Sequence, residues 1–151
     1  MEDFFCLNTK DKEVFAFTDG ASKGNPGESS YAFCICNPQG KIIFEEAGYL
    51  GRSTNNAAEY WGLIKLLERA KGLKFSRITV FSDSLLLVQQ IQGKYRVSSP
   101  NLKPLYQKAQ RLIAYFDSFR ILHIPREQNK YTDSLASGII ENKIELPQLG
   151  R

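Results

Sequence analysis

Residues 15–27 read FAFTDGASKGNPG, an apolar run that stops at Asp19 and is followed by small, polar and turn-forming residues. A buried strand that carries one carboxylate to its end and then opens into a tight loop has this composition. Gly20, Gly24 and Gly27 permit positive φ and allow another backbone to approach closely. We therefore predict a strand over residues 13–18, with Asp19 at its end and a loop behind it.

The composition is that of one globular domain. The 151 residues are 42% hydrophobic and 24% charged, and the excess of Lys and Arg over Asp and Glu gives a formal net charge of +4. This balance is compatible with a polyanionic partner such as nucleic acid, although many proteins with the same balance bind none. The three cysteines lack the companions that a zinc site needs, so we interpret them as reduced thiols.

The sequence also indicates where the domain lies along the chain and in the cell. We predict a domain over residues 13–142, with an N-terminal extension over 1–12 and a C-terminal tail over 143–151. The first residues do not resemble a signal segment, and no apolar stretch reaches membrane-spanning length. We expect a cytoplasmic monomer without a membrane partner.

The remaining secondary structure follows from hydrophobic periodicity and from turn residues. Strands are predicted over residues 29–37, 41–49, 77–82 and 119–124, and helices over about 55–71, 84–92 and 101–116, with a last helix from 127 or 129 to about 142. The turn at 37–40 is so short that its two strands must be antiparallel, whereas the later alternation of strand and helix is typical of parallel strands. The expected fold class is α/β, a five-stranded mixed sheet with three antiparallel strands and then parallel ones, covered by helices on both faces.

Four carboxylates are candidates for one site. Asp19 and Asp83 each follow a predicted strand, and Glu59 and Asp133 lie in the early turns of predicted helices. If the two strands are adjacent and parallel, their carboxyl ends place both aspartates at one edge of the sheet. Clustered carboxylates repel unless cations neutralise them, and hard oxygen ligands favour Mg²⁺ or Mn²⁺.

Each of these acidic residues also has an ordinary structural interpretation. Asp83 could cap the helix that follows it, and Asp133 could complement the dipole of the last helix. Glu59 could be a solvated helix residue, and Asp19 a turn residue before glycine. The spacing of the four residues alone does not decide between these interpretations.

The flanking motifs resemble type 1 ribonuclease H. Four segments match that family in order: residues 18–27 (TDGASKGNPG), 54–60 (TNNAAEY), 82–84 (SDS) and 129–136 (NKYTDSLA). The resemblance covers residues 13–142 and implies a ribonuclease H-like fold. It further implies a metal-dependent endonuclease that cleaves the RNA strand of RNA/DNA hybrids and leaves 3′-hydroxyl and 5′-phosphate ends.

The resemblance also assigns expected roles to residues. Asp19, Glu59, Asp83 and Asp133 would be the catalytic, metal-binding carboxylates for two Mg²⁺ or Mn²⁺ ions, with Glu59 near the RNA 2′-hydroxyl. The positions matching minor-groove contacts to the hybrid are Asn25, Asn55 and Asn56. Those matching a pocket for a phosphate of the DNA strand are Arg52, Thr54 and Asn101.

Two features depart from well-known bacterial members of the family. Those members carry a histidine in a flexible loop before the last helix, whereas the one histidine here, His123, falls in the last predicted strand and reads as structural. We hypothesise that Arg126 takes over part of that loop's role in product release. The region at 93–100 is short and only modestly basic, which is typical of a short-loop subgroup without the basic protrusion and predicts a shallow salt dependence.

Two alternatives to a hybrid-specific nuclease stay open. The chain could be a hybrid-binding module that has lost catalysis, although all four carboxylates are present. It could also apply the same chemistry to double-stranded RNA.

Overall fold

The order of strands in the sheet confirms the predicted fold class. A computed structural model describes residues 13–149, so the predicted extension over residues 1–12 lies outside it. The strands are β1 (Glu13–Gly24), β2 (Gly27–Cys36), β3 (Ile42–Ser53), β4 (Arg77–Ser82) and β5 (Ser118–His123). They form one sheet in the order β3-β2-β1-β4-β5, antiparallel from β3 to β1 and parallel from β1 to β5.

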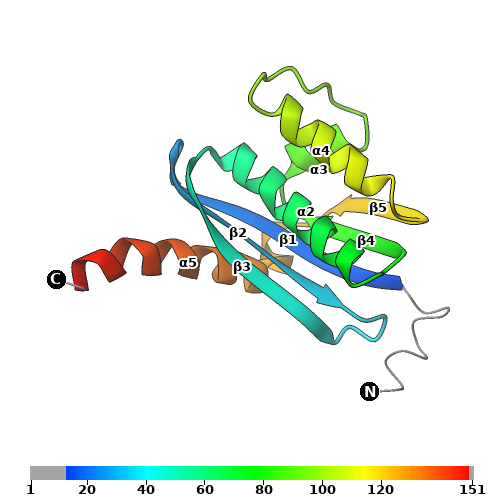
Figure 1. The fold of residues 1–151 in the computed structure, drawn as a ribbon, viewed down its shortest axis with the longest axis horizontal. Helices are drawn as coiled ribbons and strands as arrows, with labels where there is room; N and C mark the ends of the chain where they lie inside the picture. The colour runs from blue at the N-terminus through cyan, green and yellow to red at the C-terminus, as the bar shows by residue number, and fades with distance from the viewer. Residues whose placement is uncertain (1–12, 150–151) are drawn as a thin grey trace.

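Helices lie on both faces of this sheet (Figure 1). They are α2 (Asn55–Gly72), α3 (Leu85–Ile91), α4 (Lys103–Ile113) and α5 (Lys130–Leu149), with a 3₁₀ turn, η1 (Arg126–Gln128), before α5. Helices α2, α3 and α4 lie on one side and α5 on the other. None of the helices described over residues 13–149 is long and apolar enough to span a membrane.

Alternation along β2 explains the two layers. Tyr31, Phe33 and Ile35 are buried in the core on the α2 side, whereas Ser30 and Cys34 contact Ala136 and Thr132 of α5. Because successive side chains of a strand point to opposite faces, a strand that is apolar on both faces is covered on both. The central position of β1 and β2 therefore places the residues around Asp19 between two helical layers.

Several boundaries differ from the sequence predictions. Strand β1 continues to Gly24, so Asp19 lies inside the strand and the predicted loop behind it is strand. The reason is pairing: β1 stays in register with β2 from Phe15–Cys36 to Gly24–Gly27, and the Ser29 hydroxyl there lies 3.1 Å from the Ser22 hydroxyl.

The last helix is also longer than predicted. Helix α5 continues to Leu149, beyond the expected end near residue 142, so most of the predicted tail is helical. Strand β3 likewise runs past residue 49 to Ser53, because it pairs with the extended part of β2.

Candidate active site

Asp19 is buried at the point where two parallel strands separate. Pairing between β1 and β4 ends at Thr18 and Ser82, and Asp19 is the next residue of β1, still paired with Ala32 of β2. Its side chain is 3% exposed. Ligand sites in α/β sheets form at this end of parallel strands, so the predicted edge position of Asp19 is confirmed, although β1 itself continues.

Two glycines let α2 pack closely enough to bring Glu59 to Asp19. A Cβ atom on Gly20 would lie 2.3 Å from the Ala58 carbonyl carbon, and one on Gly62 would lie 2.7 Å from Thr18 Oγ1. The Gly20 N–H donates a hydrogen bond to Glu59 Oε1 at 3.0 Å. Glu59 is therefore fixed against β1, and the interpretation as a solvated helix residue is wrong.

Asp83 is free for the site because its neighbour caps the following helix. Ser84 Oγ accepts a hydrogen bond from the Leu87 N–H at 3.2 Å, which completes the N-cap of α3. The Asp83 carboxylate instead accepts a hydrogen bond through Oδ2 from Asn129 Nδ2 at 3.2 Å. The alternative that Asp83 caps α3 is therefore wrong.

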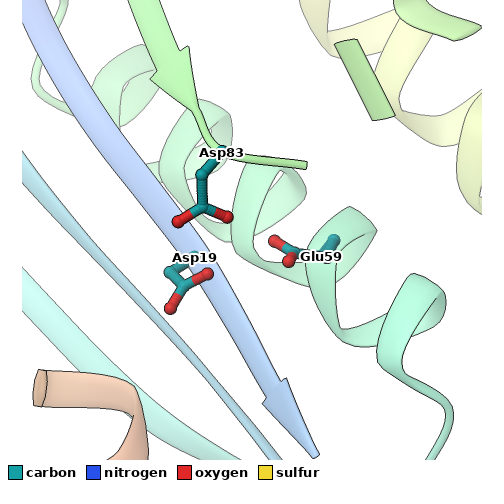
Figure 2. A group of neighbouring side chains, drawn as sticks. All are labelled: Asp19, Glu59 and Asp83. Carbon is teal, nitrogen blue, oxygen red and sulfur yellow. The ribbon is translucent and has the colours of Figure 1, made fainter. Parts of the chain in front are cut away.

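The three carboxylates converge from three elements of the fold. Each of Asp19, Glu59 and Asp83 offers an oxygen that lies within 4.8 Å of those of the other two. Figure 2 shows the side chains pointing toward one another from β1, from α2 and from the bend after β4. Asp133, in the first turn of α5, is outside this group but close enough to interact with Asp19.

Burial and mutual repulsion raise the pKa of two of these acids. The pKa of Asp19 lies far above its usual range, mainly because of burial and then because of the charge of Glu59 and contact with Asp133. The pKa of Glu59 is raised to about 8 by burial and by the charge of Asp83, against the Gly20 N–H and the positive charge of Arg126, which lower it. A cation would relieve both effects, since it replaces protons as the source of positive charge.

The donor set fits a hard divalent cation. The group contains carboxylate oxygens and neither histidine nor cysteine, which is the ligand chemistry of Mg²⁺ and Mn²⁺. Asp19 Oδ2 is buried and has no hydrogen-bond partner among the described residues. Because a buried carboxylate oxygen without a partner is costly, this atom is suited to a metal ion.

The residues predicted to bind substrate divide into two places. Thr54 caps α2 by accepting a hydrogen bond from the Ala57 N–H at 3.2 Å, and Asn25 Oδ1 accepts one from the Asn55 N–H at 2.9 Å. Asn25, Asn55, Asn56 and Arg52 are exposed around this end of α2. Asn101 is exposed in the turn before α4, and no hydrogen bond between described residues joins it to Thr54 or Arg52.

The segment before α5 contains Arg126, and the strand before it contains the one histidine. Arg126 lies in η1 and is near enough for its charge to lower the pKa of Glu59. His123 lies in the last strand, as predicted, and it is exposed at the end of β5 rather than buried in the core. Sequence reasoning gave Asn129 only a possible place at the start of the last helix and of the fourth motif, and it gave Gly62 no role.

Comparisons with known proteins agree with this geometry. A family model described as reverse transcriptase-like matches residues 17–138. The ribonuclease HI of Halobacterium salinarum is 36% identical over 129 residues, which cover 85% of this chain and 65% of that protein. The bifunctional protein Rv2228c of Mycobacterium tuberculosis is 37% identical over 130 residues. The chain spans just under two thirds of the first relative and 36% of the second.

Solved structures extend the likeness to the whole fold. The crystal structure of RNase H1 from Halobacterium salinarum matches with a TM-score of 0.84 and 36% identity, covering 86% of this chain and 98% of that one. The crystal structure of LC11-RNase H1 in complex with an RNA/DNA hybrid matches with a TM-score of 0.83 and 32% identity, covering 87% and 99%.

Proposed function

This chain belongs to the type 1 ribonuclease H family, and on that premise we propose that it hydrolyses the RNA strand of RNA/DNA hybrids, leaving 3′-hydroxyl and 5′-phosphate ends. One observation carries the proposal: carboxylates from β1, α2 and the end of β4 lie within 4.8 Å of one another, at the carboxyl end of two parallel strands. The likeness to a solved RNase H1 in complex with an RNA/DNA hybrid supports the choice of substrate.

The acidic residues would act by holding two divalent ions. Asp19, Glu59 and Asp83 supply oxygens at one point, and Asp133 would complete the set from the first turn of α5. When bound, Mg²⁺ or Mn²⁺ would supply an acidic water as nucleophile and positive charge beside the leaving oxygen. Hydrogen bonds from Gly20 to Glu59 and from Asn129 to Asp83 hold two of the carboxylates in place.

The hybrid would lie across the start of α2. The bond from the Asn55 N–H to Asn25 Oδ1 joins the turn between β1 and β2 to this helix, and these two residues, with Asn56, would contact the minor groove. Asparagine suits this role because its amide both donates and accepts. Arg52 and Thr54 would grip a phosphate of the DNA strand, helped by the positive end of α2, with Asn101 as a further contact. Arg126, beside Glu59, would assist product release.

A cleavage assay tests the proposal. The parent chain should cut a labelled RNA/DNA hybrid in Mg²⁺ or Mn²⁺ and leave single-stranded RNA intact, whereas Asp83→Asn should lose cleavage. Asp117→Asn is the matched control, because Asp117 is exposed in the turn before β5 and away from the site. Binding of the hybrid without cleavage in either metal would instead indicate an inactive binding module.

The same assay resolves substrate range. Double-stranded RNA and a DNA duplex with a single ribonucleotide, tested beside the hybrid, show whether the chemistry extends beyond hybrids. We expect the hybrid to be preferred, since one RNA and one DNA strand meet both the proposed minor-groove contacts and the proposed phosphate pocket. The cytoplasmic location and the monomeric state stay predictions.

A further inference from the structure

Asn129 is a buried polar residue beside the site, next to but not among the four carboxylates. It lies between η1 and α5 and is 2% exposed. Its Nδ2 group donates two hydrogen bonds, one to the Thr18 carbonyl oxygen at 3.0 Å and one to Asp83 Oδ2 at 3.2 Å. One amide therefore joins the ends of β1 and β4 to the start of α5.

Helix capping does not account for this arrangement. An asparagine in front of a helix normally uses its side-chain oxygen to accept an N–H of the first turn. Here Asn129 Oδ1 is buried and accepts no hydrogen bond within residues 13–149. The bond to α5 is made by the main chain, since the Asn129 carbonyl oxygen accepts from the Asp133 N–H at 3.0 Å. The side chain is committed to the strand ends instead.

The two acceptors are the groups that the fold leaves in need of a donor. Thr18 is the last residue of β1 that pairs with β4, so its carbonyl oxygen lies where the parallel ladder ends. Asp83 lies in the bend between β4 and α3, facing the carboxylates of Asp19 and Glu59, which repel it. A neutral amide with two hydrogens can satisfy both acceptors without adding charge to the site.

We propose that Asn129 is a positioning residue for the metal site. Its amide fixes the Asp83 carboxylate relative to the backbone next to Asp19, so that both aspartates are already oriented toward the cation site before a cation binds. The inference rests on the proposed function, because it concerns the same carboxylates. Groups that orient metal ligands typically change metal affinity by about 10- to 100-fold when they are removed. Asn129 would thus affect the ion without touching it.

Mn²⁺ binding by the substrate-free protein tests this role directly. Calorimetric titration with MnCl₂ should show affinity weakened about 10- to 100-fold in Asn129→Ala. Asn129→Ser should behave alike, because serine supports a helix start but its side chain is one atom shorter. The matched control is Ile140→Ala, which opens a cavity under α5 at a side chain that is 5% exposed and outside the site.

Kinetics separate positioning from general destabilisation. Asn129→Ala and Asn129→Ser should lower kcat and raise the Mn²⁺ concentration for half-maximal cleavage, while KM for the hybrid stays within about twofold. Ile140→Ala should lower the melting temperature but leave Mn²⁺ affinity unchanged. If Asn129→Ser, or Asn129→Ala, binds Mn²⁺ as tightly as the parent, the positioning role is refuted. The unmutated protein distinguishes failure of the positioning role from failure of the proposed function. If the unmutated protein neither binds Mn²⁺ nor cuts the hybrid, the proposed function itself is refuted.

Discussion

Replacing Gly20 by alanine tests the contact that brings Glu59 to Asp19. The added Cβ would lie 2.3 Å from the Ala58 carbonyl carbon and 2.4 Å from the Glu59 nitrogen, whereas ordinary contact begins at 3.4 Å. The obstacles are backbone atoms of α2, so a rotamer change cannot relieve the overlap. The helix must move away from β1 by about 1 Å, the difference between those distances.

The expected cost follows from that displacement. Overpacking of this kind destabilises a fold by about 1–3 kcal/mol. The displacement also separates Glu59 from Asp19 and Asp83, and a misplacement of about 1 Å in a catalytic group can cost on the order of 100-fold in rate. We therefore expect Gly20→Ala to lower both the melting temperature and kcat, although the substitution keeps the N–H that donates to Glu59.

Thermal unfolding and steady-state cleavage of a hybrid measure the two effects. Gly138→Ala is the matched control, because a Cβ at Gly138 meets nothing within 4 Å. Alanine there should stabilise α5 by about 0.5–1 kcal/mol and leave kcat unchanged. If Gly20→Ala has the same melting temperature and kcat as the parent, close packing of α2 on β1 is not what brings Glu59 to Asp19.

Three further predictions concern ions and charge. Mn²⁺ binding should release protons and tighten as pH rises between about 6 and 9, because metal competes with protons on Asp19 and Glu59, whose pKa values are raised. Calorimetry in buffers of different ionisation enthalpy measures the proton release, and equal Mn²⁺ affinity across that pH range would contradict the prediction. Arg126→Ala should lower kcat by about 10-fold, which corresponds to about 1.4 kcal/mol of activation free energy, while the rate of single-turnover cleavage stays unchanged. An unchanged multiple-turnover rate would reject a role of Arg126 in product release. The logarithm of hybrid affinity should fall with the logarithm of salt concentration by about 0.9 for each phosphate contacted, and we expect a shallow slope. A slope as steep as that of a family member with the basic protrusion would contradict the prediction that residues 93–100 make few phosphate contacts.

Much of the fold and site could be predicted because the local sequence patterns favour the same strands and helices that tertiary packing stabilises. Asp83 follows a β-branched strand and precedes a serine that can cap, and Thr54 stands before an amphipathic helix that carries Glu59. These signals are short in range, and the strand order then brings the two aspartates to adjacent strand ends. The family motifs supplied the combination, because each acidic residue alone had an ordinary interpretation.

The rest depended on contacts that no local pattern records. The run after Asp19 reads as a loop because it is small and polar, yet pairing with β2 and the hydroxyls of Ser22 and Ser29 extend β1 through it. Gly62 in the middle of α2 would be judged unfavourable by helix propensity, but it permits the contact with Thr18. Asn129 looks like a helix cap and instead bonds Asp83, which only the arrangement of three distant segments reveals.

The stability of Asp19→Asn measured together with its cleavage activity tests the central claim most directly. Because the folded-state pKa values of Asp19 and Glu59 are raised, the contribution of these two carboxyls to stability is greatest below the ordinary carboxyl pKa. For Glu59, this contribution is lost as pH rises toward about 8 in the metal-free parent. Asparagine at position 19 removes an ionisable carboxyl that is disfavoured by burial and by the charge of Glu59. In EDTA at pH 8, a gain of about 1 kcal/mol would raise the melting temperature by roughly 2–4 °C.

If the acidic cluster holds cations at a cost in stability, one substitution should have opposite effects on activity and stability. Asp19→Asn should abolish cleavage of an RNA/DNA hybrid in Mg²⁺ or Mn²⁺ and raise the melting temperature of the metal-free protein. Cleavage that survives in Asp19→Asn would contradict the placement of the active site at the carboxyl end of the parallel strands.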